Sequence, residues 1–412
     1  MTKARQSGMV LHRFPTRSIR QQMEDQFADI RPYRDDEVRP VVIRLLDDNE
    51  FLENIAKLRV PRLTRHCPRL VRPLVRWLLG RELAHVDTVY GLQTIVKKYM
   101  DRMIESSTDQ FSISGLAELG ADEPYLFMSN HRDIALDPAF VNYALYHNGH
   151  ETVRIAIGDN LLSKPFAADL MRANKSFIVK RSAKGPRQML AAYKNLSAYI
   201  RHSIKVDRNP IWIAQREGRA KDGNDRTEPA IIKMLTMAQD KNAQSFSDFV
   251  NDLHIVPIAI SYEYDPCDGA KARELHEKAT QGHYQKAEHE DLKSIALGIS
   301  GKKGDVHVCF GTPLRGNFET PEQVAAAVDR QVIDHYVLHP SNFFAYRMLH
   351  GSYPALPCGA SKATFVAGQH SAAEQLFSQR IAALPEAHRP YALAIYANPI
   401  VSKLSLAATT DA

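Results

Sequence analysis

The sequence predicts an α/β protein in which a largely buried mixed sheet is flanked by helices and extended by helical regions at both ends. Two observations carry this prediction. Between residues 111 and 318, short apolar runs of strand length alternate with segments of helical periodicity. Before and after that stretch, the apolar residues follow helical spacing. We therefore expect a helical N-terminal domain (1–110), an α/β domain (111–318) and a helical C-terminal region (319–412).

Composition narrows the class of protein. The chain has 412 residues, which is more than one small core needs, and a formal net charge of +6 that favours an anionic partner. Its 4 cysteines are far apart and no histidine cluster completes a zinc site, so we expect neither a bound metal nor a disulfide framework. The chain contains no apolar stretch approaching the ~20 residues of a spanning helix. We expect a cytoplasmic protein, peripheral on the inner face of the membrane.

The N-terminal domain contains a basic amphipathic segment at residues 59–83. Seven arginines occur there before the first acid, Glu82, and Trp77 adds an amphipathic ring. An apolar stripe follows helical spacing through Val71, Leu74, Val75 and Leu78. Two interpretations stay open: a helix lying on anionic lipid, or a helix that buries its stripe in the protein and solvates its arginines. Aromatic residues among the arginines are few, so we expect no nucleic-acid partner.

The α/β domain is predicted from six strand-like runs. They cover residues 125–128, 153–157, 177–179, 211–214, 255–260 and 306–310. A helical pattern follows the first run and stops at Asn148-Gly149. In the flanking regions, helices are expected near 92–104, 321–338 and 372–384, with a loop rich in Pro, Gly and Ser at 351–362.

The junction between the first strand and its helix carries the chemistry. It holds His131, Asp133 and Asp137, and reactive groups in open α/β sheets lie at the carboxyl ends of strands. A histidine beside a carboxylate is a minimal general-base pair, because the acid fixes the tautomer of the ring while the other nitrogen takes the proton.

Two further strands end in charged residues. The strand at 177–179 runs into Lys180-Arg181, and the strand at 211–214 is followed by Glu217-Gly218-Arg219. Arginine binds a phosphomonoester bidentately, and a glycine lets the backbone approach a ligand closely. These residues predict a phosphate site above one edge of the sheet, with Glu217 accepting from a substrate hydroxyl or positioning an arginine.

Four blocks in order resemble the motifs of the glycerophospholipid acyltransferases: the His131 junction, 176–181, 211–220 and the apolar strand 255–260. The family has four residues between its histidine and aspartate, whereas this chain has five between His131 and Asp137. The third block also departs from the family, with Gln215-Arg216 in place of Phe-Pro and Ala220 where serine is usual. By resemblance, Asp137 orients His131, and Asp133 is the substitute.

The resemblance implies an acyltransferase. It would move a fatty acyl group from acyl-CoA or acyl carrier protein to a hydroxyl of lysophosphatidic acid, with glycerol 3-phosphate as the alternative acceptor. His131 would be the general base, while Lys180, Arg181, Glu217, Gly218 and Arg219 would bind the acceptor. The thiolate leaves readily, so neither a cofactor nor a metal is expected. A hypothesis from another class is a non-catalytic, membrane-surface binding protein on the same fold.

Overall fold

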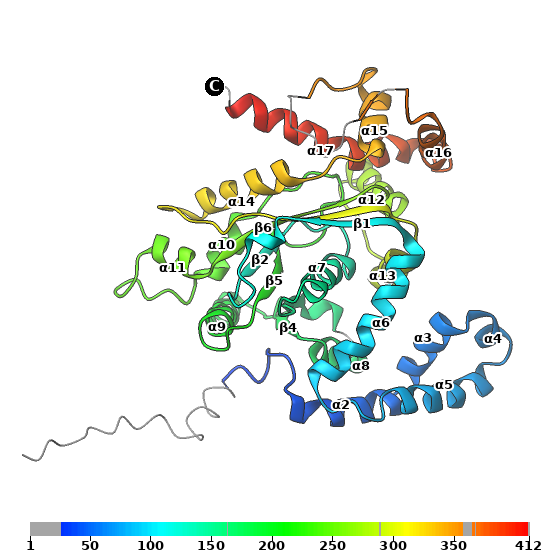
Figure 1. The fold of residues 1–412 in the computed structure, drawn as a ribbon, viewed down its shortest axis with the longest axis vertical. Helices are drawn as coiled ribbons and strands as arrows, with labels where there is room; N and C mark the ends of the chain where they lie inside the picture. Colours follow the sequence, from blue (N-terminus) through cyan, green and yellow to red (C-terminus); the bar gives the residue numbers. More distant parts are fainter. Residues whose placement is uncertain (1–25, 163, 288–289, 357–364, 367, 411–412) are drawn as a thin grey trace, which may run out of the picture.

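A computed structural model describes residues 26–410, except 163, 288–289, 357–364 and 367. A central sheet is covered by helices on both faces, as Figure 1 shows. Helices α2–α5 lie at one end of the molecule, and helices α15–α17 lie at the opposite end. This arrangement confirms the predicted α/β class with helical regions at both ends.

The described part of the chain forms a seven-stranded mixed sheet in the order β1-β7-β6-β2-β5-β3-β4. The strands are β1 (Thr108–Ser114), β2 (Leu126–Ser129), β3 (Arg154–Gly158), β4 (Ser176–Val179), β5 (Ile211–Ala214), β6 (Ile255–Tyr262) and β7 (Gly304–Phe310). Strands β6 and β7 pair antiparallel, and the other neighbours pair parallel. Strands β2, β3, β4, β5 and β6 therefore end at the same edge of the sheet.

Each of the six predicted strands is present, as β2 to β7. Strand β1 was not predicted. Strand β2 is buried at all four of its positions and β6 at all eight, which explains why both are continuous apolar runs. Strand β1 lies at the edge of the sheet and is only partly buried. Its sequence, TDQFSIS, therefore lacks the apolar run that identifies an interior strand.

Helices cover both faces of the sheet. Leu126 and Met128 of β2 pack into one core together with α9 (Pro186–Lys205), α10 (Pro229–Leu235), α11 (Phe246–Asp252) and α14 (Pro321–His335). Phe127 points to the opposite face, where it packs with α6 (Val89–Ser107) and α7 (Leu136–His147). This alternation is the period of an extended strand. Because α14 belongs to the first core, part of the C-terminal region packs directly on the sheet.

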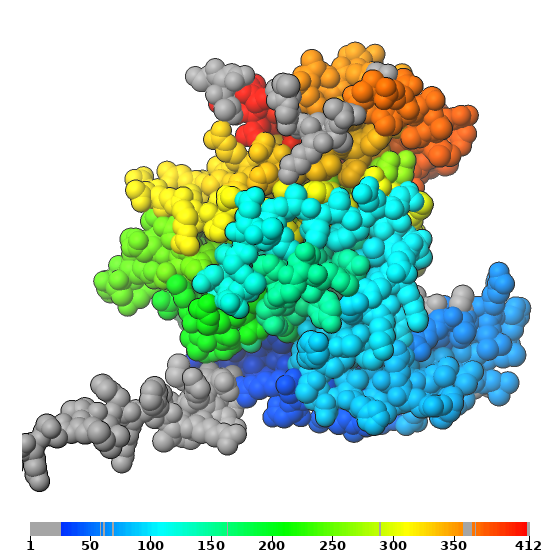
Figure 2. Space-filling view, viewed as in Figure 1, coloured from blue at the N-terminus to red at the C-terminus, as the bar shows by residue number. Residues whose placement is uncertain are grey.

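The N-terminal helices build a core of their own. They are α2 (Asp35–Asp47), α3 (Asn49–Arg59), α4 (Pro61–His66) and α5 (Pro68–Glu82). Val71 and Val75 of α5 are buried in this core. Leu74, Leu78 and Trp77 remain 45%, 42% and 56% exposed. The predicted stripe is thus split between the core and the surface; Figure 2 shows these helices, in blue, at the lower side of the molecule.

The remaining helices complete the α/β and C-terminal regions. They are α8 (Pro165–Ala173), α12 (Asp268–Gln281), α13 (Glu290–Ser300), α15 (Pro340–His350), α16 (Ser371–Ala382) and α17 (Arg389–Thr410), with short 3₁₀ turns at Leu116–Glu118, Asp159–Leu161 and Glu386–His388. Half of the expected loop at 351–362, residues 357–362, lies outside the described residues. Across the described ranges, no helix has the length and apolar character needed to cross a membrane.

Candidate active site

The shared strand edge opens into a cavity of about 620 Å³. Its wall includes His131 after β2, Arg181 after β4, and the segment from Arg216 to Arg219 after β5. Parallel pairing brings these strand ends together although they are up to 88 residues apart in the sequence (219 minus 131). The cavity therefore joins three of the four blocks that the sequence analysis singled out.

His131 and Asp137 form a hydrogen-bonded pair. Nδ1 of His131 lies 2.9 Å from Oδ2 of Asp137. The aspartate side chain is fully buried, whereas the histidine is partly exposed and lines the cavity. A proton on Nδ1 is then donated to the carboxylate, which leaves Nε2 with a free lone pair for a substrate proton.

The other contacts of Asp137 fix its orientation. Its Oδ2 also accepts the backbone N–H of Arg132 at 2.7 Å and that of Asp133 at 3.0 Å. Its Oδ1 accepts the phenol of Tyr262, on β6, at 2.7 Å. A buried carboxylate that accepts this many hydrogen bonds cannot rotate freely, so it holds the histidine ring in one orientation.

Asp133 has a different place. Its Oδ1 accepts the backbone N–H groups of Ala135 and Leu136, both at 2.9 Å, and so caps the start of α7. Burial and the neighbouring charge of Asp137 raise the pKa of Asp133 above its usual value. Of the two acids, Asp137 is the one whose carboxylate contacts the ring of His131.

Arg181 reaches the cavity over the end of β3. Its Nη1 lies 3.3 Å from Oε1 of Glu217, and both side chains line the cavity. A Cβ at Gly158 would come within 3.1 Å of Nε of Arg181, so a glycine there lets the guanidinium lie across the strand end. Asp159 accepts the backbone N–H of Arg181 at 3.1 Å and fixes the loop that carries it.

Arg219 is the most buried of the predicted cations. Its side chain is 8% exposed, and Nη2 lies 4.0 Å from Oδ1 of Asp291 on α13. Gly218 precedes it with φ +73°, a backbone conformation that glycine adopts without strain. The turn after β5 thereby directs Arg219 into the cavity, beneath α13.

Lys180 does not join this group. It forms an ion pair with Asp29, in the N-terminal part of the chain, and is absent from the cavity wall. The reason is the alternation of side chains in extended backbone: Lys180 and Arg181 are neighbours, so they point to opposite sides. The expectation that Lys180 binds the acceptor with Arg181 does not fit this geometry.

Trp212 and Arg216 are two of the cavity residues that were not predicted as site residues. Trp212, on β5, packs edge-on against His131 with ring centroids 5.9 Å apart. Arg216 lies next to Glu217 in the cavity wall, and its Nη2 is 3.7 Å from Oε1 of Glu228. Arg216 could have been found from its position between a strand end and Glu217, whereas Trp212 looked like a core residue of its strand.

The cavity has a charged part and an apolar part. The charged part contains the arginines after β4 and β5 together with Lys221, Lys286 and Asp291. The apolar part is lined by Ile155, Ile157, Leu161, Met171, Val179, Ile213 and Met234. His131 belongs to the same wall, so one cavity could hold an anionic group and an aliphatic chain at once. Among the residues that the structure describes, no cluster of His, Cys, Asp or Glu is arranged to hold a metal ion.

Comparison with known proteins identifies this domain. Residues 110–261 match the family model described as Acyltransferase. The dihydroxyacetone phosphate acyltransferase of Bos taurus is 22% identical over 230 residues, which are 55% of this chain and 31% of the bovine protein. The structure of the 1-acyl-sn-glycerophosphate (LPA) acyltransferase PlsC from Thermotoga maritima aligns with 12% identity and a TM-score of 0.37, over 69% of this chain and 92% of that one.

The matched region, residues 110–261, is thus an acyltransferase domain. The four sequence blocks that resemble the glycerophospholipid acyltransferases all lie within this matched region. The alignment spans about a third of the length of the bovine relative, 31%.

Proposed function

We propose that the protein transfers a fatty acyl group from acyl-CoA or acyl carrier protein to a hydroxyl of lysophosphatidic acid. The observation that carries this proposal is the His131–Asp137 pair in the wall of a cavity that also presents arginines and an apolar surface. A general base, a phosphate site and an acyl site are the three parts that this reaction needs.

The reaction requires one proton transfer and one substitution at a carbonyl. Nε2 of His131 takes the proton of the acceptor hydroxyl while its oxygen attacks the thioester carbonyl, and Asp137 stabilises the imidazolium that forms. The new C–O bond replaces the C–S bond. The thiolate leaves and recovers the proton from His131, so every atom and charge is balanced without a covalent acyl-enzyme.

The arginines orient the acceptor. Arg181 and Arg219 both line the cavity, and each is paired with a carboxylate, Glu217 or Asp291, that a phosphate can replace. A phosphate held there contributes orientation, because it brings the hydroxyl to the base. Arg216 adds a third cation on the same wall.

Two other acceptors fit the same chemistry. Glycerol 3-phosphate offers the same phosphate and a free hydroxyl without an acyl chain. Dihydroxyacetone phosphate is the third candidate, because the bovine relative is named for it. The deciding experiment incubates purified protein with labelled acyl-CoA, or acyl carrier protein loaded with the same chain, and the three acceptors in competition.

The expected result is a labelled product from a phosphate-bearing acceptor, with most label on lysophosphatidic acid, and none from a His131→Ala variant. Most label on another of the three acceptors would move the assignment within the class. Absence of transfer to any of them, from either donor, would reject the proposal and favour the non-catalytic alternative.

The protein is also proposed to lie on an anionic membrane surface. Leu70, Leu74 and Trp77 of α5 are 74%, 45% and 56% exposed, beside the buried Val71 and Val75 of the same helix. Arg62 and Arg65 are exposed on the neighbouring helix α4, and Arg72 is exposed on α5. Apolar side chains flanked by arginines suit the boundary between lipid headgroups and acyl chains. Such a contact would supply the lipid substrates.

A further inference from the structure

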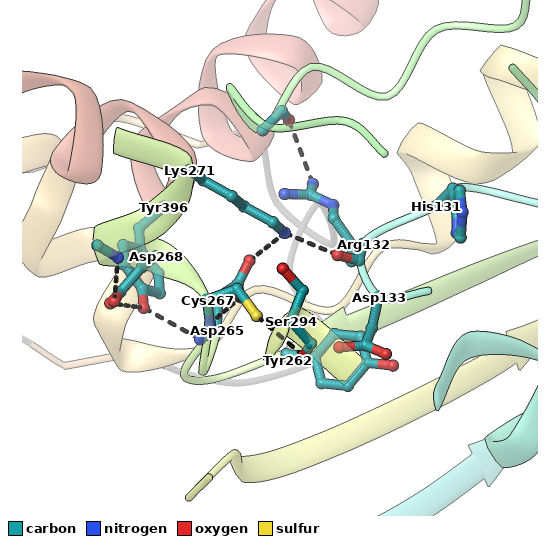
Figure 3. Close-up of polar contacts among 12 residues, drawn as sticks. His131, Arg132, Asp133, Tyr262, Asp265, Cys267, Asp268, Lys271, Ser294 and Tyr396 are labelled. Carbon is teal, nitrogen blue, oxygen red and sulfur yellow. Dashed lines mark hydrogen bonds and ion pairs between the residues drawn. The ribbon is translucent and has the colours of Figure 1, made fainter. Parts of the chain in front are cut away.

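The peptide group between Arg132 and Asp133 is held from both sides next to the proposed catalytic pair. Its N–H donates to Oδ2 of Asp137 at 3.0 Å, and its carbonyl oxygen accepts from Nζ of Lys271 at 2.7 Å. The same Oδ2 atom contacts Nδ1 of His131. One peptide group therefore separates Lys271 from the carboxylate that orients the base. Figure 3 shows the contact between Lys271 and the carbonyl of Arg132.

Lys271 lies outside both the cavity and the matched family region. It is on α12, its side chain is 2% exposed, and the family model ends at residue 261. Its ammonium is ion-paired with Asp265. Because it does not line the cavity, any influence on the reaction must pass through the residues that it contacts.

The C-terminal helices hold this ion pair in place. The backbone N–H of Asp265 donates to Oη of Tyr396, on α17, at 3.0 Å. The carbonyl of Asp265 accepts from Arg380, on α16, at 2.8 Å. Tyr396 and Arg380 also both donate to Oδ2 of Asp268, at 2.7 and 2.6 Å. The support of Lys271 thus extends to α16 and α17.

The positive charge of Lys271 affects the hydrogen bond that the peptide group donates to Asp137. A charged donor to a carbonyl polarises the peptide group, so the N–H on the other side becomes a stronger donor. Here that N–H belongs to Asp133 and points at Asp137. Lys271 thereby fixes the carboxylate and draws part of its negative charge away from the imidazole.

Other charged groups surround the same loop. Asp225 accepts from the side chain of Arg132 at 2.6 Å, and Tyr262 reaches Asp137 from β6. Asp133 lies beside the peptide, and Lys303, before β7, is electrostatically coupled to Asp133. None of these groups donates to the Arg132 carbonyl, where Lys271 is the donor found among the described residues.

We propose that Lys271 is a positioning residue for the general base, acting through the Arg132–Asp133 peptide group, and that helices α16 and α17 hold it there. The inference rests on the proposed function, in which His131 is that base. It means that the support of the active site continues beyond the matched acyltransferase region into the C-terminal helices.

The principal variant is the double substitution Lys271→Met/Asp265→Asn. It removes both charges of the buried pair, so that no unpaired charge stays in the interior. We expect kcat to fall roughly 10- to 100-fold, as for other residues that orient an active-site ligand or base. KM for donor and acceptor should stay close to the wild-type values, because Lys271 touches neither.

Lys403→Met is the matched control. Lys403, on α17, is also a buried lysine that donates to a backbone carbonyl at 2.7 Å, but its acceptor is Asp334, away from the catalytic loop. We expect this variant to lose thermal stability while it keeps the wild-type kcat. Equal losses of kcat in the control and the double variant would show a merely structural role and overturn the proposal.

A second readout does not depend on turnover. The Nδ1–H proton of His131 can be followed by NMR of histidine-labelled full-length protein, assigned with a His131→Gln variant. In the double variant we expect its resonance to move downfield, because the N–H of Asp133 then donates less strongly to Oδ2 of Asp137, and that oxygen accepts more strongly from Nδ1–H. If the wild-type protein transfers no acyl group, the proposed function fails, whereas an unchanged Nδ1–H resonance in the double variant refutes the Lys271 inference separately.

Tyr396→Phe covers the case in which the double variant does not fold. It keeps the aromatic ring in the core and removes the one hydroxyl that joins Asp265 and Asp268 to α17. We expect a smaller fall in kcat and a smaller shift of the His131 Nδ1–H resonance in the same direction. Wild-type values for both would overturn the link to the C-terminal helices.

Discussion

Tyr262 donates its phenol hydrogen to Oδ1 of Asp137 at 2.7 Å, across a separation of 125 residues. This contact joins β6 to the start of α7, and the opposite carboxylate oxygen contacts His131 at 2.9 Å. The central strands of the sheet therefore determine where the histidine ring lies. Burial and the charge of Asp137 raise the pKa of Tyr262 well above its usual value, so the phenol keeps the proton that it donates.

Replacement of His131 by alanine should abolish acyl transfer without unfolding the protein. Loss of a general base typically costs about 10²–10⁴ in rate. His131 is partly exposed in the cavity wall, so its removal leaves the core packing intact. Steady-state turnover and thermal unfolding should be measured together; near wild-type turnover would show that another group is the base.

Asp137→Asn should lower kcat far more than Asp133→Asn. The Asp137 carboxylate contacts the ring, whereas Asp133 caps α7 through its Oδ1, which an asparagine side chain can replace. The reverse ranking of kcat would assign the orienting role to Asp133.

Asp133→Asn should also change the pH dependence of stability. The pKa of Asp133 is raised in the folded protein, so the folded state binds its proton more tightly than the unfolded state does. Ionisation of Asp133 therefore destabilises the wild type as the pH rises through the unfolded and then the folded pKa. The variant lacks this loss, so its melting temperature relative to wild type should be higher at neutral pH than at low pH.

Arg219→Ala and Arg181→Ala should raise KM for the phosphate-bearing acceptor by roughly 10-fold or more, since hydrogen bonds to charged groups contribute about 1.5–3 kcal/mol each. KM for the acyl donor should change less. Lys180→Ala is the control, because Lys180 carries the same charge next to Arg181 but pairs with Asp29 away from the cavity. A rise of the acceptor KM in the control, or equal rises for donor and acceptor in the arginine variants, would contradict phosphate binding at this site.

Asp291→Asn should lower the acceptor KM. Asp291 lies 4.0 Å from Arg219 and also pairs with Lys286, so its negative charge competes with a bound phosphate for both cations. Glu290→Gln, on the same helix, removes an equal charge from a side chain bonded to Tyr284 at 2.6 Å outside the cavity wall. The prediction fails if both variants have the wild-type KM or shift it equally.

Binding to anionic vesicles should depend on α4 and α5. Arg62/Arg65/Arg72→Gln removes three exposed cations from this surface, each of which contributes about 1 kcal/mol near an anionic leaflet. Arg208/Arg226/Lys241→Gln removes three exposed cations elsewhere and is the control. Co-sedimentation at low salt should weaken in the first variant alone; equal binding by both variants would leave α5 as a packed structural helix.

Much of the sheet could be predicted because a strand in the interior of a sheet is a continuous apolar run, which is visible in the sequence. Three strand ends of the site were found from apolar runs followed by charged residues, and Asp137, the acid preferred over Asp133, is the one that contacts His131. Strand β1 was missed because an edge strand does not need an apolar run. Lys180 and Arg181, which follow β4, were both predicted to bind the acceptor. The alternation of side chains in extended backbone would have been enough to place them on opposite sides.

The tertiary contacts of the site could not be predicted in the same way. Tyr262 contacts Asp137 across 125 residues, and Lys271 contacts Arg132 across 139 residues. The residues next to Tyr262 and Lys271 in the sequence give no sign of these contacts. Their roles depend on which elements pack side by side, which single-sequence patterns do not record. Trp212 was predicted as a strand residue, and its place beside His131 emerges only when β5 pairs with β2.

Gly298 of α13 lies in close contact with Asp133. A Cβ at this position would overlap the carboxylate of Asp133, so the backbone of α13 packs directly against the residue that caps α7. One turn or two earlier, the same helix carries Asp291, Leu292 and Ile295 into the cavity wall. A larger residue at position 298 would have to displace either α13 or the Asp133 carboxylate. The absence of a side chain at this one position therefore determines how closely α13, and with it one wall of the cavity, approaches the loop that carries His131.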